Sequence, residues 1–444
     1  MSSNIGWTDE TWNFLLGCER VTKGCDGCYA ITTANIRKSN PNPKIAAAYA
    51  GLVERNETGR LDWTGQVRVV EDRLHKPLTW RKPRRIFVNS MSDLFHADVP
   101  IGVIAEAFAV MALTPQHHYQ LLTKRHGRMR SVLRSAEFAR LVWDWVRTFA
   151  EPPAEDRRVP AERIDAAIKL ITDRPDGEPM PPLPNVWIGV SVEDQATANL
   201  RIPALLDTPA AVRWISAEPL LGPVDLTAWM APRTPADSAD APATWHEWTW
   251  PDWVPADARQ QIESFWSESI GRSPRRWLQN AHDNGAPAFG QEWTTHPSMR
   301  PAGSPADRHT GRYIHAWNNI GRLALPDGSM GYTSFTERHV RDQLGLHWVV
   351  VGGETGPGCR PMHPDWARSL RDQCRNSAGT KFFFKQWGDW HPAPTQLVLN
   401  DPAWTLRFCG DTRESWTFQR GPRHRNELDG EVIEEYPSLL AAVR

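Results

Sequence analysis

Apolar runs of strand length alternate with helical patterns through the first half of the chain. An apolar run at 86–89 predicts a buried strand that leads into a polar loop, and apolar residues spaced three and four apart predict a helix over 99–113. The next strand is expected within 117–125, and a second helix over 136–150. The charged segment 151–160, with its prolines, has the composition of a surface excursion.

The alternation continues after this segment and returns near the C-terminus. Further strands are expected within 185–194, 211–226, 347–356 and 381–388, and further helices over 195–206 and 364–376. Strands that alternate with helices are typical of parallel βαβ units. The fold class is therefore expected to be α/β.

The alternation is absent between 227 and 345, a region rich in Pro, Trp, Asp and Arg with one long apolar helical pattern around 257–280. We interpret 227–345 as an insertion into a single α/β domain, which is formed by residues 1–226 and 346–395. Residues 396–444, where the alternation is also lost, are expected to form a C-terminal extension.

Polar and charged side chains follow the predicted strands. They are, in chain order, Ser90, Ser92, Asp93, Lys124, Arg125, Ser191, Glu193, Asp194, Glu218, Glu354 and Lys385. The carboxyl ends of parallel strands meet at one edge of a sheet, so we expect these side chains to share a pocket. Helix capping is the alternative, and it accounts well for Ser92, Asp93, Ser191 and Asp194. It accounts less well for Lys124, Arg125, Glu218, Glu354 and Lys385.

The overall composition restricts the class of protein. A formal net charge of −1 gives no general attraction to nucleic acid or to a membrane surface, although a local basic groove remains compatible with it. No apolar stretch reaches about eighteen residues, and the N-terminus lacks the basic start and apolar run of a signal peptide. We therefore expect a cytoplasmic protein that has no membrane partner.

Three of the six cysteines fall within one segment, GCERVTKGCDGCYA, at residues 17–30. Clustered cysteines in a reducing compartment indicate metal or redox chemistry rather than disulfides. A glycine precedes each of Cys18, Cys25 and Cys28, and glycine permits the tight turns that wrap a cluster. Three thiolates leave one iron of a four-iron cluster open for chemistry, as catalytic zinc sites keep one open position. These cysteines are therefore expected to ligate a 4Fe–4S cluster.

Two alternatives remain for this segment. One is a structural zinc site with a fourth ligand from elsewhere, such as His75, His96 or a distant cysteine. Structural zinc sites usually contain paired C-x2-C units, however, and this segment contains one. The other alternative is a set of three reduced cysteines that bind nothing.

The cysteine segment, followed by a series of strands and helices, resembles the radical S-adenosylmethionine (SAM) superfamily. In that superfamily three cysteines hold a 4Fe–4S cluster, and the open iron binds the amino and carboxylate groups of SAM. The spacing here is Cys18-x6-Cys25-x2-Cys28, which departs from the commonest C-x3-C-x2-C. The aromatic residue Tyr29 also follows the third cysteine instead of preceding it.

The strings GWTDETWNFLLGCERVTKGCDGCYA, FVNSMSDLFHADVP, SAEPLLGPVDL and VVVGGETGPGCRP support a closer resemblance. They are similar to a phage- and prophage-associated three-Cys-motif family of largely unassigned function, over roughly 1–226 and 346–390. This resemblance implies a partial or full TIM-type barrel with a cluster at its mouth. The Trp-rich insertion and the C-terminal extension lie outside the resemblance.

The resemblance also implies roles for the strand-end residues. The expected contacts to SAM are Ser90, Ser92, Asp93, Arg125 and Glu354, and the expected catalytic residues are Lys124, Glu218 and Lys385. The string Gly352-Gly353-Glu354 is similar to one that holds the SAM amino group in many members, with a structural turn as its alternative. For Lys124 and Arg125 the alternative is a pair of solvated charges at a helix start.

The implied chemistry is that of the cofactor. An electron donor reduces the cluster, SAM is cleaved, and a 5′-deoxyadenosyl radical abstracts hydrogen from a substrate that the protein binds and shields from water. Phage association and basic strand ends imply a nucleotide or a DNA base as the substrate, and a phage-encoded protein as a partner.

The tryptophans of the insertion, with Arg272, Arg275 and Arg276 beside Trp277, are open to two interpretations. Such aromatic residues stack on unpaired bases in some proteins, and in others they form the core of a small domain. Two functions therefore compete with a radical SAM-type enzyme. One is a non-enzymatic interaction module stabilised by zinc or a cluster, and the other is a nucleic-acid-binding phage accessory protein.

Overall fold

The computed structural model describes residues 5–151, 159–174, 177–230, 345–377, 379–393 and 425–437, with the short stretches 322–324, 330–332, 405–409 and 415–421. The chain divides into two compact units, one of residues 1–232 with 345–444 and the other of residues 233–344. Of the second unit only a hairpin is described, formed by β10 (Arg322–Ala324) and β11 (Met330–Tyr332). The helix expected around 257–280 lies outside the described residues.

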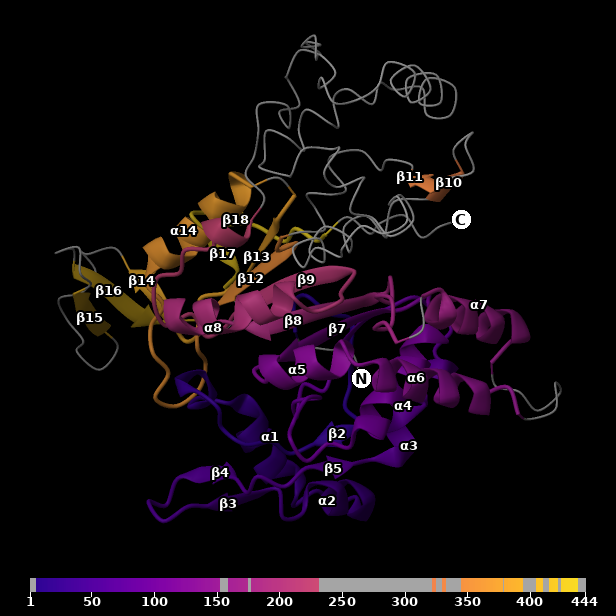
Figure 1. The fold of residues 1–444 in the computed structure, drawn as a ribbon. Coiled ribbons are helices and arrows are strands. Elements are labelled where there is room, and N and C mark those ends of the chain that lie inside the picture. Colours follow the sequence, from indigo (N-terminus) through magenta and orange to yellow (C-terminus); the bar gives the residue numbers. More distant parts are fainter. Residues whose placement is uncertain are drawn as a thin grey trace, which may run out of the picture. The chain divides into compact units, whose positions relative to one another are not determined.

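Seven parallel strands form one sheet in the first unit, and their spatial order is the same as their order in the chain. The strands are β1 (Glu10–Trp12), β6 (Arg85–Val88), β7 (His118–Thr123), β8 (Val186–Ser191), β9 (Val212–Ala217), β12 (Trp348–Gly352) and β13 (Lys381–Gln386). The sheet curls into a half-barrel (Figure 1). Its edge strands are β1 and β13. The expected α/β class is confirmed, and the barrel is open in the part of the chain that the structure describes.

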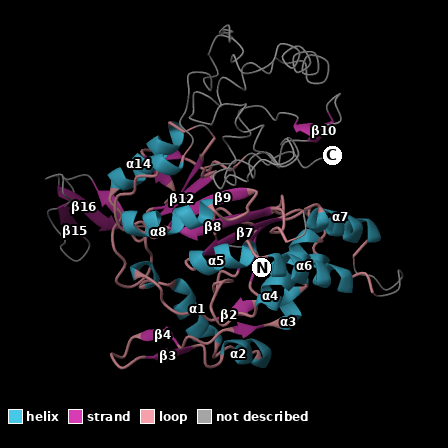
Figure 2. Ribbon diagram, in the orientation of Figure 1, coloured by secondary structure: helices cyan, strands magenta, loops and turns pink. Residues whose placement is uncertain are grey.

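Helices cover the outer face of the sheet (Figure 2). They are α4 (Ile101–Ala112), α5 (His126–Leu133), α6 (Ala136–Thr148), α7 (Ala161–Thr172), α8 (Gln195–Leu206) and α14 (Pro364–Arg375). α8 begins where it was expected because Asp194 and Thr197 form a capping box at its start. The main apolar core lies between these helices and the sheet.

Aromatic side chains fill the amino-terminal part of the inner face. Trp214 lies against Trp7 and Trp348, with ring centroids 5.3 and 5.2 Å away, and Trp187, Phe87 and Phe383 complete the group. Gly189 is needed there, because a Cβ atom would lie 2.5 Å from the indole nitrogen of Trp214. Packing on this face thus accounts for four of the 23 tryptophans of the chain.

Residues 425–437 of the expected C-terminal extension pack on the same unit. The carbonyl group of Glu435 accepts a hydrogen bond of 2.8 Å from the indole of Trp348, and the ring of Tyr436 lies under the guanidinium of Arg85. This segment includes a hairpin of β17 (Glu427–Leu428) and β18 (Glu431–Val432). A separate antiparallel sheet contains β14 (Trp390–Ala393), β16 (Ser415–Arg420) and β15 (Thr405–Cys409).

A small subdomain is inserted between β1 and β6. Its elements are β2 (Leu15–Leu16), η1 (Lys23–Cys25), α1 (Tyr29–Arg37), α2 (Pro43–Tyr49), β3 (Val53–Arg55), β4 (Leu61–Trp63), β5 (Arg68–Val69), α3 (Glu71–Leu74) and η2 (Lys76–Thr79). It has its own apolar core, in which Ile31 and Ala34 of α1 pack against Tyr49 and Val53. This subdomain carries the cysteine segment.

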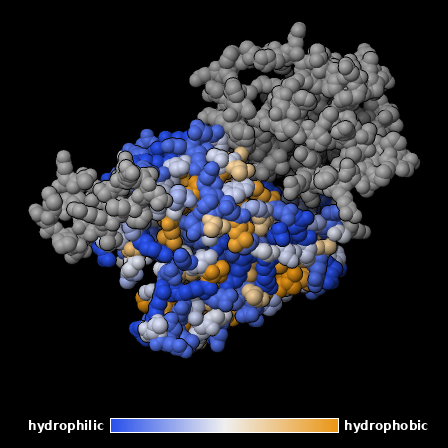
Figure 3. Space-filling model, turned by 60° about the vertical axis from the view of Figure 1, so that its left-hand side comes forward, coloured by the Kyte–Doolittle hydropathy of each residue, from blue (hydrophilic) through white to orange (hydrophobic). Residues whose placement is uncertain are grey.

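One face of the described chain is mainly hydrophilic, with apolar side chains scattered over it (Figure 3). No helix among the described residues is both long enough and apolar enough to cross a membrane. The final described element before residue 231 is the short turn η4 (Thr227–Trp229).

Candidate functional site

The cysteine segment follows the first strand of the sheet and is fixed at its start by Gly17. The amide of Gly17 donates a 3.2 Å hydrogen bond to the carbonyl of Met91, and Gly17 also bridges to Ser92. Its φ is +91°, and any Cβ atom would overlap the carbonyl oxygen of Gln66. Glycine is therefore required here for the reason expected from the sequence.

The glycines before the other two cysteines are required for a different reason. Neither Gly24 nor Gly27 has a positive φ. A Cβ atom on Gly24 would lie 2.5 Å from a carboxylate oxygen of Glu193, and one on Gly27 would lie 2.7 Å from a carboxylate oxygen of Glu354. The loop thus lies directly on two carboxylates that follow β8 and β12.

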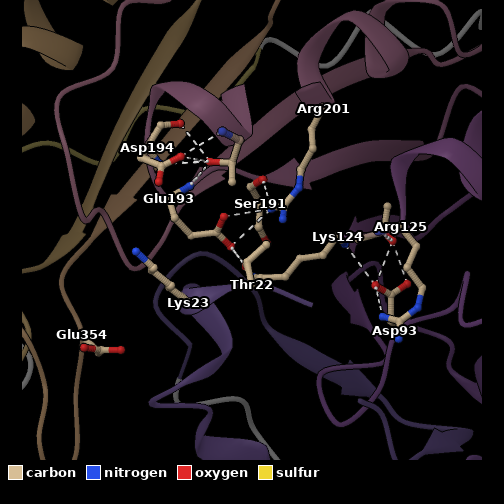
Figure 4. Close-up of polar contacts among 12 residues, drawn as sticks. Thr22, Lys23, Asp93, Lys124, Arg125, Ser191, Glu193, Asp194, Arg201 and Glu354 are labelled. Carbon is tan, nitrogen blue, oxygen red and sulfur yellow. Dashed lines mark hydrogen bonds and ion pairs between the residues drawn. The ribbon is translucent and has the colours of Figure 1, made fainter. Parts of the chain in front are cut away.

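Glu193 is 1% exposed and is surrounded by positive charge. Its carboxylate lies 3.0 Å from Arg201 and 3.1 Å from the ammonium group of Lys124, and it accepts a hydrogen bond from the hydroxyl of Thr22 (Figure 4). Burial by itself raises the pKa of Glu193, but the two cations outweigh it and hold the pKa below its ordinary value. The carboxylate therefore connects the cysteine loop to β7 and α8.

Glu354 makes the second connection. Its carboxylate accepts hydrogen bonds from the backbone amide and the guanidinium of Arg360, at 2.7 to 2.9 Å. The same guanidinium donates a 2.8 Å bond to the carbonyl of Lys23 in the loop. Gly353 of the expected glycine string allows the backbone at Trp387 to approach closely, and a Cβ atom there would overlap that backbone.

Asp93 joins the ends of β6 and β7 and borders the first cysteine. It accepts hydrogen bonds from the hydroxyl of Thr123 at 2.7 Å and the amide of Lys124 at 3.0 Å. It also lies 3.5 Å from Arg125 (Figure 4). The guanidinium of Arg125 is 3.9 Å from the sulfur of Cys18. The predicted residues Asp93, Lys124 and Arg125 are thus brought together beside the loop.

The two predicted serines have partners within the chain. The hydroxyl of Ser92 donates to the carbonyl of Leu15 at 3.0 Å, and that of Ser90 bonds with the side chain of Asn13. The carbonyl of Ser90 accepts a 2.8 Å bond from the hydroxyl of Tyr29. These contacts orient the start of α1 against the end of β6.

Glu218 and Lys385 form an ion pair in which both side chains are partly buried. Glu218 follows β9 and Lys385 lies near the end of β13, so the pair spans the intervening strand β12. The side chain of Glu218 passes over Gly352, where a Cβ atom would lie 3.2 Å from its carboxylate carbon. The first glycine of the string Gly352-Gly353-Glu354 therefore makes room for this pair.

Tyr29, the first residue of α1, lies between the loop and the strand ends. Its side chain is 52% exposed, and its hydroxyl donates a hydrogen bond to the carbonyl of Ser90, which follows β6. Burial of the hydroxyl and, to a smaller extent, the nearby Cys28 and Glu218 raise the pKa of Tyr29. Tyr29 is therefore within electrostatic reach of the third cysteine and of the Glu218–Lys385 pair.

The three thiols are unpaired and partly exposed. Burial raises the pKa of Cys18 to about 12 and also raises that of Cys28, so both are protonated at neutral pH in the absence of a metal. Cys28 interacts electrostatically with both other cysteines, and Lys124 partly offsets its raised pKa. In the described ranges, no three His, Cys, Asp or Glu side chains form a group close enough to hold one metal ion.

Three residues of this site were not predicted from the sequence: Thr22, Arg201 and Arg360. Arg201 carried a usable signal, because it lies on the buried face of the predicted helix between Ala198 and Leu205. A charged residue in an apolar stripe indicates a buried partner. Arg360 lies in a loop without periodicity, and nothing local marks its contact with Lys23.

Comparison with known proteins gives a family and no activity. A family model described as "Protein of unknown function (DUF5131)" matches residues 2–437. Neither the curated proteins nor the solved structures contain a significant match. Since the matched region includes every element of the site, the chain belongs to the DUF5131 family of unknown function.

Proposed function

We propose that Cys18, Cys25 and Cys28 bind a 4Fe–4S cluster and that the protein is a radical SAM-type enzyme. The observation that carries this proposal is the position of the cysteine loop. It follows the first strand of a parallel half-barrel and lies on the carboxyl ends of β8 and β12, where α/β enzymes collect their functional groups.

Among the described residues the three thiols are not grouped closely enough to hold a single metal ion, and a cluster does not require that grouping. One zinc ion with bonds of about 2.3 Å would draw three sulfurs to within about 4 Å of one another. A four-iron cluster provides a separate iron for each thiolate and so suits thiols that are farther apart. The thiols interact in pairs, Cys18 with Cys28 and Cys25 with Cys28, and belong to one loop.

Nearby cations suit the negative charge that three thiolates would bring. Arg125 lies beside Cys18, and Lys124 is within electrostatic reach of Cys28. Both cations favour the deprotonated, ligating form of the cysteines. When bound, the cluster would supply one electron for reductive cleavage of SAM.

The strand ends around Tyr29 are the proposed place for SAM and the substrate. Lys124 carries an ammonium group, and Glu218 with Lys385 provides a carboxylate and a second ammonium group. These groups are suited to bind the carboxylate and amino ends of a zwitterion and to orient it. Lys124, Glu218 and Lys385 would exchange their present ion-pair partners for these ends, whereas Ser92, Asp93 and Glu354 are proposed to keep the strand ends in place.

Anaerobic purification followed by metal and sulfide analysis tests the proposal. We expect about four irons with acid-labile sulfide per chain. After reduction, the protein should convert SAM to 5′-deoxyadenosine, and Cys25→Ala should abolish both cluster and product. Cys359→Ala, outside the loop, is the matched control and should retain both.

One equivalent of zinc without sulfide would instead support the structural module, and the proposal would be abandoned. The expected nucleotide or DNA substrate remains a prediction. Adding nucleosides or DNA to the same assay tests it, since a true substrate should be altered in step with 5′-deoxyadenosine formation.

A further inference from the structure

Arg360 joins two segments that are far apart in the sequence. It follows β12 and is fixed there by Glu354, which accepts hydrogen bonds from both its amide and its guanidinium. The guanidinium also reaches the cysteine loop, where it bonds the carbonyl of Lys23 and lies 3.5 Å from the carboxylate of Asp26. Lys23 and Asp26 flank Cys25.

The bonded carbonyl belongs to the turn that carries the second cysteine. Lys23 is the first residue of η1, which ends at Cys25. The carbonyl of Lys23 also accepts a 3.1 Å hydrogen bond from the amide of Asp26. The carbonyl of Cys25 in turn accepts the amide of Cys28 at 3.3 Å. Holding Lys23 therefore restrains Cys25 and, through it, Cys28.

Arginine suits this position because its planar guanidinium presents five donors in a fixed fork. Two guanidinium nitrogens of Arg360 contact Glu354, and one of these nitrogens also serves the loop carbonyl. A lysine would supply the charge without the fork. The Glu354 side chain is only 5% exposed. Replacing Arg360 would therefore leave this buried carboxylate with fewer hydrogen-bond partners.

We propose that Arg360 is a positioning residue that, together with Glu354, holds the turn 23–26 on the sheet edge and so sets the place of Cys25 relative to Cys18 and Cys28. The role depends on the proposed function only for what the cysteines bind. The position of the loop can be measured without any metal.

The first test uses the metal-free full-length chain and the alkylation rates of its cysteines, followed by mass spectrometry. We expect Cys25 to be alkylated about tenfold faster or more in Arg360→Gln than in the wild type. The variant loses the charged donor that holds the loop, and a hydrogen bond from a charged group changes an equilibrium by about a factor of ten or more. The alkylation rate of Cys25 in Arg360→Lys should lie between the rates in Arg360→Gln and in the wild type. Arg140→Gln, which breaks an exposed pair with Asp144 on α6, is the matched control and should change nothing.

Buried Cys374 is the internal reference for folding. An unchanged Cys25 rate in folded Arg360→Gln would overturn the proposal. An equal acceleration at Cys374 would also overturn it, because Arg360 would then support the fold as a whole. The double variant Glu354→Gln with Arg360→Gln removes the buried charge as well. The double variant should be more stable to unfolding than Arg360→Gln, but its Cys25 should still be alkylated faster than that of the wild type.

The second test measures how fast iron is lost to a chelator from reconstituted protein. We expect loss about tenfold faster in Arg360→Gln than in the wild type, with Arg140→Gln unchanged. An unchanged rate of loss would count against the positioning role. Failure of the wild type to take up iron and sulfide would contradict the proposed function, and the alkylation result would still decide the role of Arg360.

Discussion

Glu218 reaches Lys385 across a whole strand, and the two form an ion pair over Gly352 of β12. Sheet neighbours in register cannot make this contact, since β9 and β13 each pair with β12 and not with each other. The pair depends on the missing side chain at Gly352. It also places a carboxylate and an ammonium group within electrostatic reach of Tyr29, which follows the third cysteine.

Gly352→Ala is expected to displace this pair. The new Cβ atom would lie 3.2 Å from the carboxylate carbon of Glu218, which is tighter than most packed contacts. If the pair orients bound SAM, a shift of this kind should reduce 5′-deoxyadenosine formation by about tenfold or more. Gly102→Ala on α4 has open space around it and is the control. Equal activity in the two variants would remove Glu218 and Lys385 from the proposed site.

Gly24→Ala is expected to destabilise the protein by about 1–3 kcal/mol. The methyl group would enter the space of the Glu193 carboxylate, which Arg201 and Lys124 hold in place. Urea unfolding at neutral pH measures the change. In Gly127→Ala the new methyl group has no atom within 4 Å, so this control should not be destabilised to a comparable degree. Equal destabilisation of Gly24→Ala and Gly127→Ala would contradict the close contact between the loop and Glu193.

Arg201→Met is expected to lower the free energy of unfolding by about 3–5 kcal/mol, because it leaves the buried carboxylate of Glu193 with one cation fewer. Adding Glu193→Gln should recover part of that loss, since no uncompensated charge then remains buried. A double-mutant cycle in urea measures the coupling between the two residues. Additive losses would show that they do not depend on each other.

His347 is expected to make the protein less stable in acid. Burial, together with the charge of Arg213, lowers its pKa from 6.5 to about 3. Between these values the unfolded chain binds a proton that the folded chain does not, so stability falls as the pH drops below 6.5. At pH 5 the difference amounts to at most about 2 kcal/mol.

The variant His347→Asn isolates this effect. Asparagine can accept the hydrogen bond that the ring nitrogen of His347 takes from the amide of Arg213, at 2.9 Å, but it does not titrate. Urea unfolding at pH 7.5 and pH 5 should show a smaller loss for the variant than for the wild type. Other buried histidines titrate in both proteins and cancel in this comparison. Equal losses would mean that His347 is not the group responsible.

Much of the fold follows from local patterns. The strands β6, β7, β8, β9, β12 and β13 were predicted because each is an apolar run that any parallel sheet buries on both faces. β1 was missed, since Glu10–Trp12 is three residues long and carries no apolar run. The helices α5 and α7 were also missed, and α5 contains mainly polar residues with weak periodicity.

The site was predictable only in part. Residues after parallel strands share one edge whatever the details, so the grouping of Asp93, Lys124 and Arg125 could be anticipated from order alone. Their partners could not. Lys23 and Arg360 are 337 positions apart, and no local spacing relates a loop arginine to one particular carbonyl group.

The sequence by itself determined the α/β class, the positions of most strands along the chain and the three-cysteine loop, because these depend on local periodicity and on spacing within a few residues. Only the tertiary structure decided that the seven strands described form a half-barrel and that the loop lies on Glu193 and Glu354. It also decided that Gly24, Gly27 and Gly352 serve close approach rather than turns. The physical reason is that these contacts depend on how segments distant in the sequence pack against each other. Such packing produces no periodic pattern in the sequence from which it could be predicted.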